Sequence, residues 1–330
     1  MRSILNRRFV LQGGLLMLAP GIAASAVAQR RSGRLPRIGF LIGNVPSFIE
    51  AFQGELRRLG YRDGETIIVE TRISRPNSDD LEAQAAELSR MNLDLIFAAA
   101  LPQALAVRRL NPKMRMVIGT APGLVANGFA KSLERPGGNA TGMDELPPGL
   151  TARRLELLRL AAPTASRIAL LSTTPGNGGH EIQLADAERA ARSADFEIKV
   201  YRARNLPELE RALVAIKNDA MSGMLTFQGA LILANAEMIA GFAADARLPA
   251  MYQSRVIADA GGLMAYSPDQ EEQFRVAARY VDQILRGADP GDLPVTHPSR
   301  YFLTFNKKAA IALRLTPSAA FIKAVDHQIG

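Results

Sequence analysis

The chain has 330 residues, of which 48% are hydrophobic and 22% charged, so it is long enough for two domains and too apolar for a disordered protein. It contains no cysteine, which excludes disulfide bonds, thiolate metal sites and cysteine nucleophiles. The net charge is +8, but the charges are mostly interspersed and form neither a basic stripe nor a nucleic-acid-binding motif. We therefore expect no nucleic-acid partner.

Residues 1–28 have the composition of an export signal. Arg7 and Arg8 precede an apolar stretch, and the small residues Ala26 and Ala28 follow it. This order is typical of a secretory signal peptide that is cleaved after Ala28. The apolar stretch is shorter than the roughly 20 residues that span a membrane, so we expect a soluble, exported, periplasmic protein. The paired arginines favour twin-arginine export, with Sec-dependent export as the alternative.

The next part of the chain alternates between short apolar strands and amphipathic helices. A strand is expected where an apolar run follows Pro36, and a helical pattern follows it and stops at Gly60. The same alternation continues to about residue 119. The expected strands cover residues 37–43, 66–70, 94–97 and 114–119.

The second half repeats this order about 130 residues later. An apolar run with Pro163 shortly before it leads into a Pro-bearing loop and a helical pattern, as in the first half. Strands alternating with helices of this length indicate parallel sheets built from βαβ units. The expected strands cover residues 167–173, 196–201, 223–227 and 250–253.

A Gly- and Pro-rich segment at residues 135–142 separates the halves, and Gly261 and Gly262 mark the end of the second. The final stretch is too small for a third domain, so we expect it to cross back and complete each half in turn. The fold class is therefore α/β, with two doubly wound parallel-sheet lobes joined by a multi-strand hinge. The expected lobe I is 36–143 plus 267–298, and lobe II is 144–266 plus 299–330.

Several motifs resemble one known family. They include Ser-Leu-Glu-Arg-Pro-Gly-Gly-Asn-Ala-Thr-Gly at residues 132–142 and Ala-Gly-Gly-Leu-Met-Ala-Tyr at residues 260–266. From export signal to C-terminus the chain is similar to substrate-binding proteins of ABC transporters that are related to tryptophan- and tyrosine-binding lipoproteins. The resemblance implies a type I periplasmic binding fold, whose two lobes close on a small-molecule ligand. It also implies an ABC permease as partner.

Two features depart from that family. The lipoprotein members carry a cysteine at the cleavage site, which this chain lacks. Many relatives have an acidic residue in the loop after the fourth strand, where this chain has Thr120, Ala121 and Pro122. These departures imply a freely soluble protein and weaken the case for an α-amino acid ligand.

Ligands of open parallel sheets bind beyond the carboxyl ends of the strands, where helix N-termini offer free N–H groups. With two lobes, both sets of loops should face one cleft, which we expect to be neutral and hydrogen-bonding, without a carboxylate. Tyr266, at the second crossover, is placed to stack on a ligand ring. The other candidates in the first lobe are Asn44, Ser47, Leu101, Pro102, Gln103 and Thr120, and in the second lobe they are Thr173, Thr174, Asn177, Gln228, Tyr252 and Gln253.

Each candidate has a structural alternative. Asn44 and Asn177 also suit helix caps, Gln103 suits a solvated position, and Tyr252 and Tyr266 suit a core with a satisfied hydroxyl. The expected ligand is a small polar or acidic organic molecule.

The sequence gives little support to an enzyme. The histidines lack the spacing of metal ligands. The glycines after residue 173 match neither the Gly-x-Gly-x-x-Gly motif nor the Walker motif ending in Gly-Lys-Ser/Thr. No Gly-x-Ser-x-Gly elbow of a hydrolase is present. The acidic pairs, including Asp144 and Glu145, fall at expected linkers or helix starts. We therefore expect a monomer without metal or cofactor that serves an importer, and the alternative is a periplasmic sensor that docks on a receptor.

Overall fold

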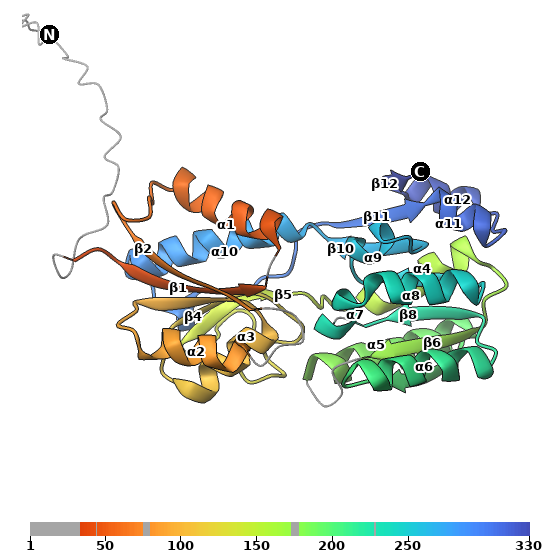
Figure 1. Cartoon of the computed structure of the whole chain (residues 1–330), viewed down its shortest axis with the longest axis horizontal. Helices are drawn as coiled ribbons and strands as arrows, with labels where there is room; N and C mark the ends of the chain where they lie inside the picture. The colour runs from red at the N-terminus through yellow and green to blue at the C-terminus, as the bar shows by residue number, and fades with distance from the viewer. Residues whose placement is uncertain (1–33, 44, 75–79, 173–177, 228) are drawn as a thin grey trace, which may run out of the picture.

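The computed structural model describes residues 34–43, 45–74, 80–172, 178–227 and 229–330. They form two α/β lobes side by side, each built on one sheet (Figure 1). We call the five-stranded sheet with its helices lobe I and the seven-stranded sheet with its helices lobe II. None of the described helices is long and apolar enough to cross a membrane.

Lobe I has the strand order β2-β1-β3-β4-β5, and its paired strands are parallel. Helices α1 and α10 cover one face of the sheet, and α2 and α3 cover the other (Figure 1). The elements are β1 (Arg37–Gly43), α1 (Pro46–Arg58), β2 (Ile68–Ser74), α2 (Asp80–Arg90), β3 (Leu95–Ala100), α3 (Leu101–Leu110), β4 (Met116–Ala121), β5 (Ala140–Asp144), α10 (Gln270–Leu285) and the 3-10 turn Pro290–Asp292.

Lobe II has the order β12-β11-β10-β9-β8-β6-β7. Its paired strands are parallel except that β11 runs antiparallel to β10, which the expectation of a parallel sheet did not include. The elements are α4 (Leu150–Ala161), β6 (Arg167–Ser172), α5 (Gly178–Ala194), β7 (Glu197–Arg202), α6 (Leu206–Asn218), β8 (Gly223–Thr226), α7 (Ala230–Ala234), α8 (Ala236–Asp245), β9 (Ala250–Tyr252), α9 (Arg255–Asp259), β10 (Met264–Pro268), β11 (Tyr301–Asn306), α11 (Lys307–Ala312), α12 (Ala319–Ala324) and β12 (His327–Ile329).

The core of lobe I is an aromatic cluster that depends on a distant helix. The rings of Phe40, Phe52 and Phe97 stack at 4.4 to 5.2 Å between centroids. Phe274 of α10 meets Phe97 edge-on at 5.6 Å. The α10 segment therefore belongs to the core of lobe I, although it follows nearly all of lobe II in the sequence.

The expected linker at residues 135–142 contains the start of a strand instead. Gly142 in β5 has φ +150°, and a Cβ there would lie 2.0 Å from the Ile118 carbonyl oxygen in β4. Glycine is needed at this position because any side chain would prevent β5 from approaching β4. The turn-like composition of this segment thus reflects close packing between two strands.

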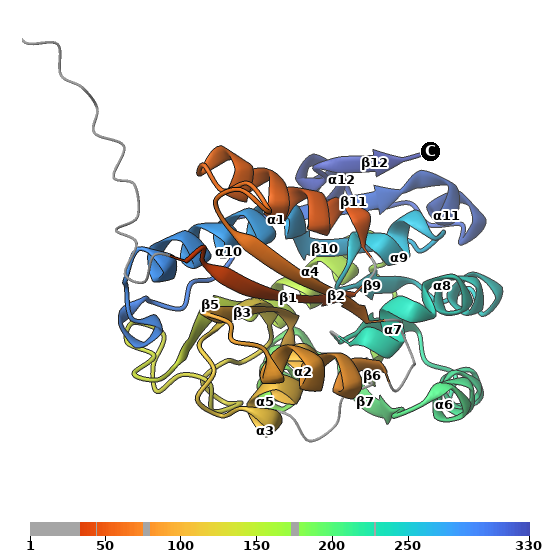
Figure 2. The ribbon, with the colours of Figure 1, turned by 60° about the vertical axis from the view of Figure 1, so that its left-hand side comes forward.

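The chain passes between the lobes after β5, after β10 and again before β11. Two of these connections are joined to each other, since Asp144 N donates to Thr296 O at 2.9 Å and Tyr301 Oη donates to Glu145 O at 3.0 Å. His297 Nδ1 lies 2.7 Å from Asp144 O. These hydrogen-bonded crossovers, which run between the two lobes in Figure 1, are the hinge, and Figure 2 gives a second view of the two lobes.

Candidate functional site

The two lobes touch through backbone beyond the carboxyl ends of β4 and β6. A Cβ built on Gly179 would lie 2.4 Å from the Pro122 carbonyl oxygen, and one built on Gly123 would lie 3.1 Å from Gly179 Cα. The Asp144 carboxylate holds this loop of lobe I by accepting the Gly123 and Leu124 N–H groups at 3.0 and 2.9 Å. The strand ends of both lobes therefore meet at one seam.

A buried carboxylate, Glu145, lies at the lobe I side of this seam. Its backbone N–H donates to Ala121 O at 3.0 Å, which fixes it beside the end of β4. The side chains of Thr120 and Gln273 act on the carboxylate electrostatically, although neither reaches ordinary hydrogen-bond geometry. Burial raises the pKa of Glu145, and these two polar groups and Arg154 oppose that rise only in part.

Arg154 of α4 is a buried cation whose charge lowers the pKa of Glu145 against the effect of burial. Its Nε and Nη2 both donate to Tyr266 O, at 3.1 and 3.0 Å, and burial lowers its pKa to about 10. The ring of Tyr266 stacks on Tyr301 at 5.6 Å. Arg154 thus links α4 to the backbone of β10 at the start of a hinge connection. Among the described residues it forms no ion pair with Glu145.

A second polar group lies at the ends of β2 and β3 in lobe I. Gln103, in the first turn of α3, donates from Nε2 to Ser74 Oγ at 3.4 Å. Its Oε1 is buried and has no partner in the described structure. The preceding Pro102 is exposed, and Leu101 packs into the lobe I core.

In lobe II, the ends of β8 and β9 carry Thr226 and Gln253, which hydrogen-bond through Thr226 Oγ1 and Gln253 Oε1. The Tyr252 ring belongs to the lobe II core, and burial raises its pKa. Ser172, at the end of β6, lies 2.6 Å from His180 Nδ1. Burial lowers the pKa of His180, so this imidazole is neutral near pH 7.

Several of these residues share one property. A buried polar side chain normally has a hydrogen-bond partner, and leaving one without a partner costs about 1–3 kcal/mol. At the strand ends of both lobes and in the first two turns of helices α3, α5 and α10, buried atoms lack a partner among the described residues: Gln103 Oε1, Thr120 Oγ1, Gln183 Oε1, Tyr252 Oη, Gln253 Nε2 and both amide atoms of Gln273.

Some of the ligand-site residues proposed from the sequence are described by the structure, and the others are not. Gln103, Thr120, Tyr252 and Gln253 are buried at strand ends, whereas Ser47 is exposed in α1. Asn44, Thr173, Thr174, Asn177 and Gln228 lie outside the described residues, as do Arg7, Arg8, Ala26 and Ala28 of the expected signal.

Sequence reasoning missed Glu145, Gln273 and Arg154. Glu145 is buried beside Thr120 rather than solvated in a linker, and the expectation of a ligand cleft without a carboxylate stays a prediction. Gln273 carried a usable signal, since it shares the helix face of Phe274 and Ala277, which is otherwise apolar.

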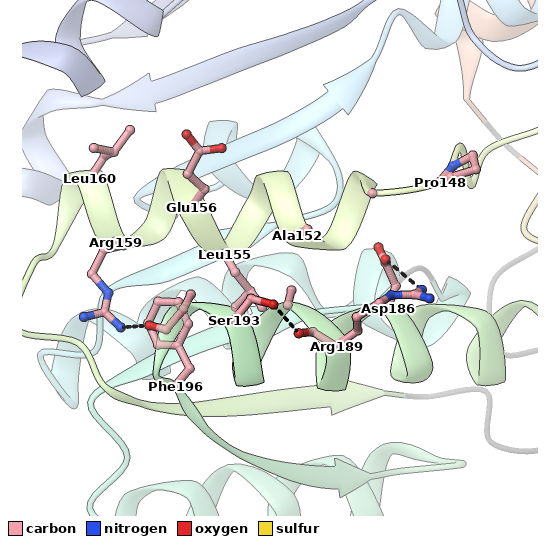
Figure 3. Close-up of a pocket in the computed structure, with 13 residues that line it drawn as sticks. Pro148, Ala152, Leu155, Glu156, Arg159, Leu160, Asp186, Arg189, Ser193 and Phe196 are labelled. Atoms are coloured by element: carbon pink, nitrogen blue, oxygen red, sulfur yellow. Dashed lines mark hydrogen bonds and ion pairs between the residues drawn. The ribbon is translucent and has the colours of Figure 1, made fainter.

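Two cavities lie near the seam or on lobe II. One, of about 310 Å³, lies between Val125 of lobe I and Ile182 of lobe II and reaches Gln183 and His297. The other, of about 750 Å³, is a groove between α4 and α5, where Arg159 stacks on Phe196 (Figure 3). None of the described ligand candidates lines either cavity, and no three His, Asp or Glu side chains of the described ranges come together as metal ligands.

Comparison with known proteins identifies relatives over most of the chain. Residues 45–328 match the family described as ABC transporter substrate binding protein. A "Tyrosine-binding protein" of Clostridioides difficile (strain R20291) is 22% identical over 278 residues, which cover 83% of this chain and 79% of the relative.

Solved structures share the fold. An ABC domain from Streptococcus pneumonia in complex with L-Trp has a TM-score of 0.80 at 20% identity, covering 88% of this chain and all of that one. A substrate-binding protein with adhesive properties from Clostridium difficile, in its ligand-free open structure, has a TM-score of 0.67 at 19% identity, covering 89% of this chain and 99% of that one.

Proposed function

Because the chain belongs to the ABC transporter substrate-binding proteins, with a type I periplasmic binding fold, we propose that it captures a small organic molecule between its lobes and delivers it to an ABC importer. The observation that carries this proposal is the set of buried polar atoms without partners at the strand ends of both lobes. A ligand held there would supply the missing hydrogen bonds and so stabilise the closed arrangement.

The cavity of about 310 Å³ between Val125 and Ile182 has the size of a metabolite site rather than of a polymer groove, which supports a small ligand. The backbones of Pro122 and Gly179 are already in contact across the seam and close one side of the interlobe space. The relatives named for tyrosine and bound to L-Trp make aromatic amino acids the first compounds to test, alongside polar and acidic organic molecules.

We further propose that residues 1–28 direct export to the periplasm and are removed after Ala28. The mature protein then acts as a monomer that docks on a permease, with the lobe boundaries given above. Its two lobes close over the ligand about the hinge and open to release it.

A thermal-shift screen of residues 29–330 against small metabolites tests the proposed function. A ligand at roughly 100 times its dissociation constant adds about 2.7 kcal/mol of stability, which raises Tm by several degrees. Tyr252→Phe should reduce the shift caused by the ligand but raise the Tm of the free protein, because it removes a buried hydroxyl that has no partner among the described residues.

Tyr61→Phe is the matched control. Tyr61 Oη donates to Asp282 at 2.9 Å within lobe I, remote from the strand ends. This variant should lower the Tm of the free protein and preserve the shift caused by the ligand. A library without hits, or hits insensitive to Tyr252→Phe but sensitive to Tyr61→Phe, would contradict the proposed function.

A further inference from the structure

The cavity of about 310 Å³ beside the seam is built by both lobes and by the hinge. Val125 comes from the loop after β4 in lobe I, Ile182 comes from α5 in lobe II, and His297 comes from a hinge connection. The two walls lie close together, since a Cβ built on Gly123 would be 3.1 Å from Ile182 Cδ1. None of the described ligand candidates from the sequence lines this cavity, so the interlobe space offers a second place for a small molecule.

One buried hydrogen-bond acceptor in the cavity wall lacks a partner. Gln183 lines the cavity, is 2% exposed, and donates from Nε2 to Gly179 O at 3.3 Å. This bond fixes the orientation of the amide, because the reversed amide would set its oxygen against the carbonyl oxygen. Gln183 Oε1 is buried and has no donor among the described residues. The group that this wall calls for is therefore an N–H or O–H donor.

The two carboxylates that line the cavity are already in use. Asp144 accepts three backbone N–H groups at 2.9 to 3.0 Å. Asp186 accepts the Thr151 N–H group at 3.0 Å and pairs with Arg189 at 3.3 Å. An anion in the cavity would meet two negative charges, and a cation would compete with Arg189 and the N–H groups for the same oxygens. The cavity therefore favours a neutral molecule.

The rest of the wall is mainly apolar. Val125 and Ile182 are 39% and 41% exposed, which is unusual among the large apolar side chains of the described residues. A molecule held between them covers this apolar surface and gains stability from its burial. The apolar wall includes Val125, Leu133, Leu146, Leu150 and Ile182.

We propose that this cavity is a second site, which binds a small, neutral, mainly apolar molecule through one O–H or N–H donor to Gln183 Oε1. Because both lobes form its walls, such a molecule binds the closed arrangement and favours it over the open one. Its effect on capture rests on the proposed function. A molecule in the second site should strengthen binding at the strand ends, and a strand-end ligand should strengthen binding in the second site by the same factor. The second site is therefore regulatory.

Matched neutral and charged compounds test this chemistry by calorimetry on residues 29–330. The first set is 1-adamantanol, 1-methoxyadamantane and adamantane-1-carboxylate, and the second is cyclohexanol, methoxycyclohexane and cyclohexanecarboxylate. Each alcohol should bind about 3- to 10-fold more tightly than its methyl ether, the usual value of one hydrogen bond, and more tightly than its carboxylate. Equal or tighter binding of the ether or the carboxylate, or no binding of either alcohol at millimolar concentration, would overturn the proposal.

A variant of Gln183 identifies the acceptor. Gln183→Met keeps the length of the side chain and removes Oε1, so it should lower the affinity for 1-adamantanol to that for its methyl ether. The affinity for the ether should stay within about twofold, because the ether makes no such hydrogen bond. Gln283→Met makes the same change at an exposed position of α10 and should leave every affinity unchanged. If Gln183→Met weakens both compounds alike, or keeps the preference for the alcohol, the assignment of Oε1 is wrong.

Titration of two compounds together separates the second site from the strand ends. L-tyrosine, or another hit of the metabolite screen that depends on Tyr252, is titrated with and without 1-adamantanol. Each compound should raise the affinity for the other by the same factor, about fivefold or more. Competition would place the alcohol at the capture site and overturn the second site while the binding function stands, and unchanged affinities would overturn its regulatory role.

The second site stays testable if the screen finds no strand-end ligand, an outcome that overturns the proposed function alone. Small-angle scattering of residues 29–330 should then show that 1-adamantanol compacts the protein and that 1-methoxyadamantane at the same concentration compacts it less. Gln183→Met should remove this difference, and Gln283→Met should keep it. Binding of the alcohol without compaction would contradict a site that both lobes form.

Discussion

Adding a single methyl group at Gly179 should weaken ligand binding without weakening the fold. Gly179 lies in the first turn of α5 with ordinary backbone angles, so alanine fits its conformation and is the better helix former. Its Cβ, however, would lie 2.4 Å from the Pro122 carbonyl oxygen and 2.6 Å from Pro122 Cβ in the other lobe. The clash therefore exists only when the lobes are together.

The size of the effect follows from this overlap. The contact is about 1 Å shorter than an ordinary one, and the opposing atoms belong to backbone and a proline ring, which yield little. Overpacking of this kind costs about 1–3 kcal/mol. Because that cost falls on the closed arrangement alone, the dissociation constant should rise about 5- to 150-fold.

Calorimetry with a hit from the metabolite screen, L-tyrosine first, measures the affinity, and small-angle scattering measures the compaction that the ligand causes. Gly179→Ala should bind more weakly and compact less, with an unchanged Tm in the absence of ligand. Gly241→Ala in α8 is the matched control, since a Cβ there meets nothing within 4 Å. Equal affinity and equal compaction for Gly179→Ala would refute the view that this contact closes the lobes.

Three further predictions concern stability. Gly142→Ala should lose about 2–5 kcal/mol in urea unfolding, since its Cβ would meet Ile118 O at 2.0 Å in a strained conformation; a loss under 1 kcal/mol would contradict this reading of β5. Burial lowers the pKa of His180, so the unfolded chain binds more protons and the stability of the wild type should fall as pH drops through about 6.5. His180→Asn should reduce this dependence of stability on pH, and an unchanged dependence would contradict the prediction. Burial raises the pKa of Glu145 above 4.5, so Glu145→Gln should raise Tm at pH 7 and lose this advantage as pH falls toward 4.5; a lower Tm at pH 7 would be the wrong sign.

Buried parallel strands were readable from the sequence. The apolar runs at the starts of the two halves become β1 and β6, buried on both faces, and most other expected strands and helices lie within a few residues of the observed ones. Such strands are nearly continuous in apolar residues, so pattern alone finds them. The type I fold inferred from the resemblance is confirmed by the solved structures.

Elements defined by their neighbours were not readable. Gly142 allows β5 to approach β4 closely, but in the sequence it belongs to a Gly- and Pro-rich segment that resembles a turn. The antiparallel direction of β11 leaves no mark in composition, and β12 has only three residues. Helix α4 was not singled out either, although it packs into the lobe II core.

The residues of the candidate site were likewise predictable from the sequence only in part. The rule that ligands bind at strand ends selected Gln103, Thr120, Tyr252 and Gln253, and their roles stay predictions. Glu145 escaped it because Gln273, which acts on the carboxylate, comes more than 100 residues later in the chain. Contacts made between two lobes and a returning helix cannot be read from local composition.

The return of α10 to lobe I also sets an order of events during synthesis. Phe274 completes the aromatic cluster around Phe97. Tyr61 donates a hydrogen bond to Asp282, which is 221 residues later in the chain, and Glu55 accepts one from Arg279, which is 224 residues later. The ribosome makes most of lobe II before these partners emerge, so lobe I keeps its aromatic rings uncovered through most of translation. Chaperones have the longest access to the first domain made, and a chain interrupted before residue 270 presents that domain as a target for aggregation or proteolysis.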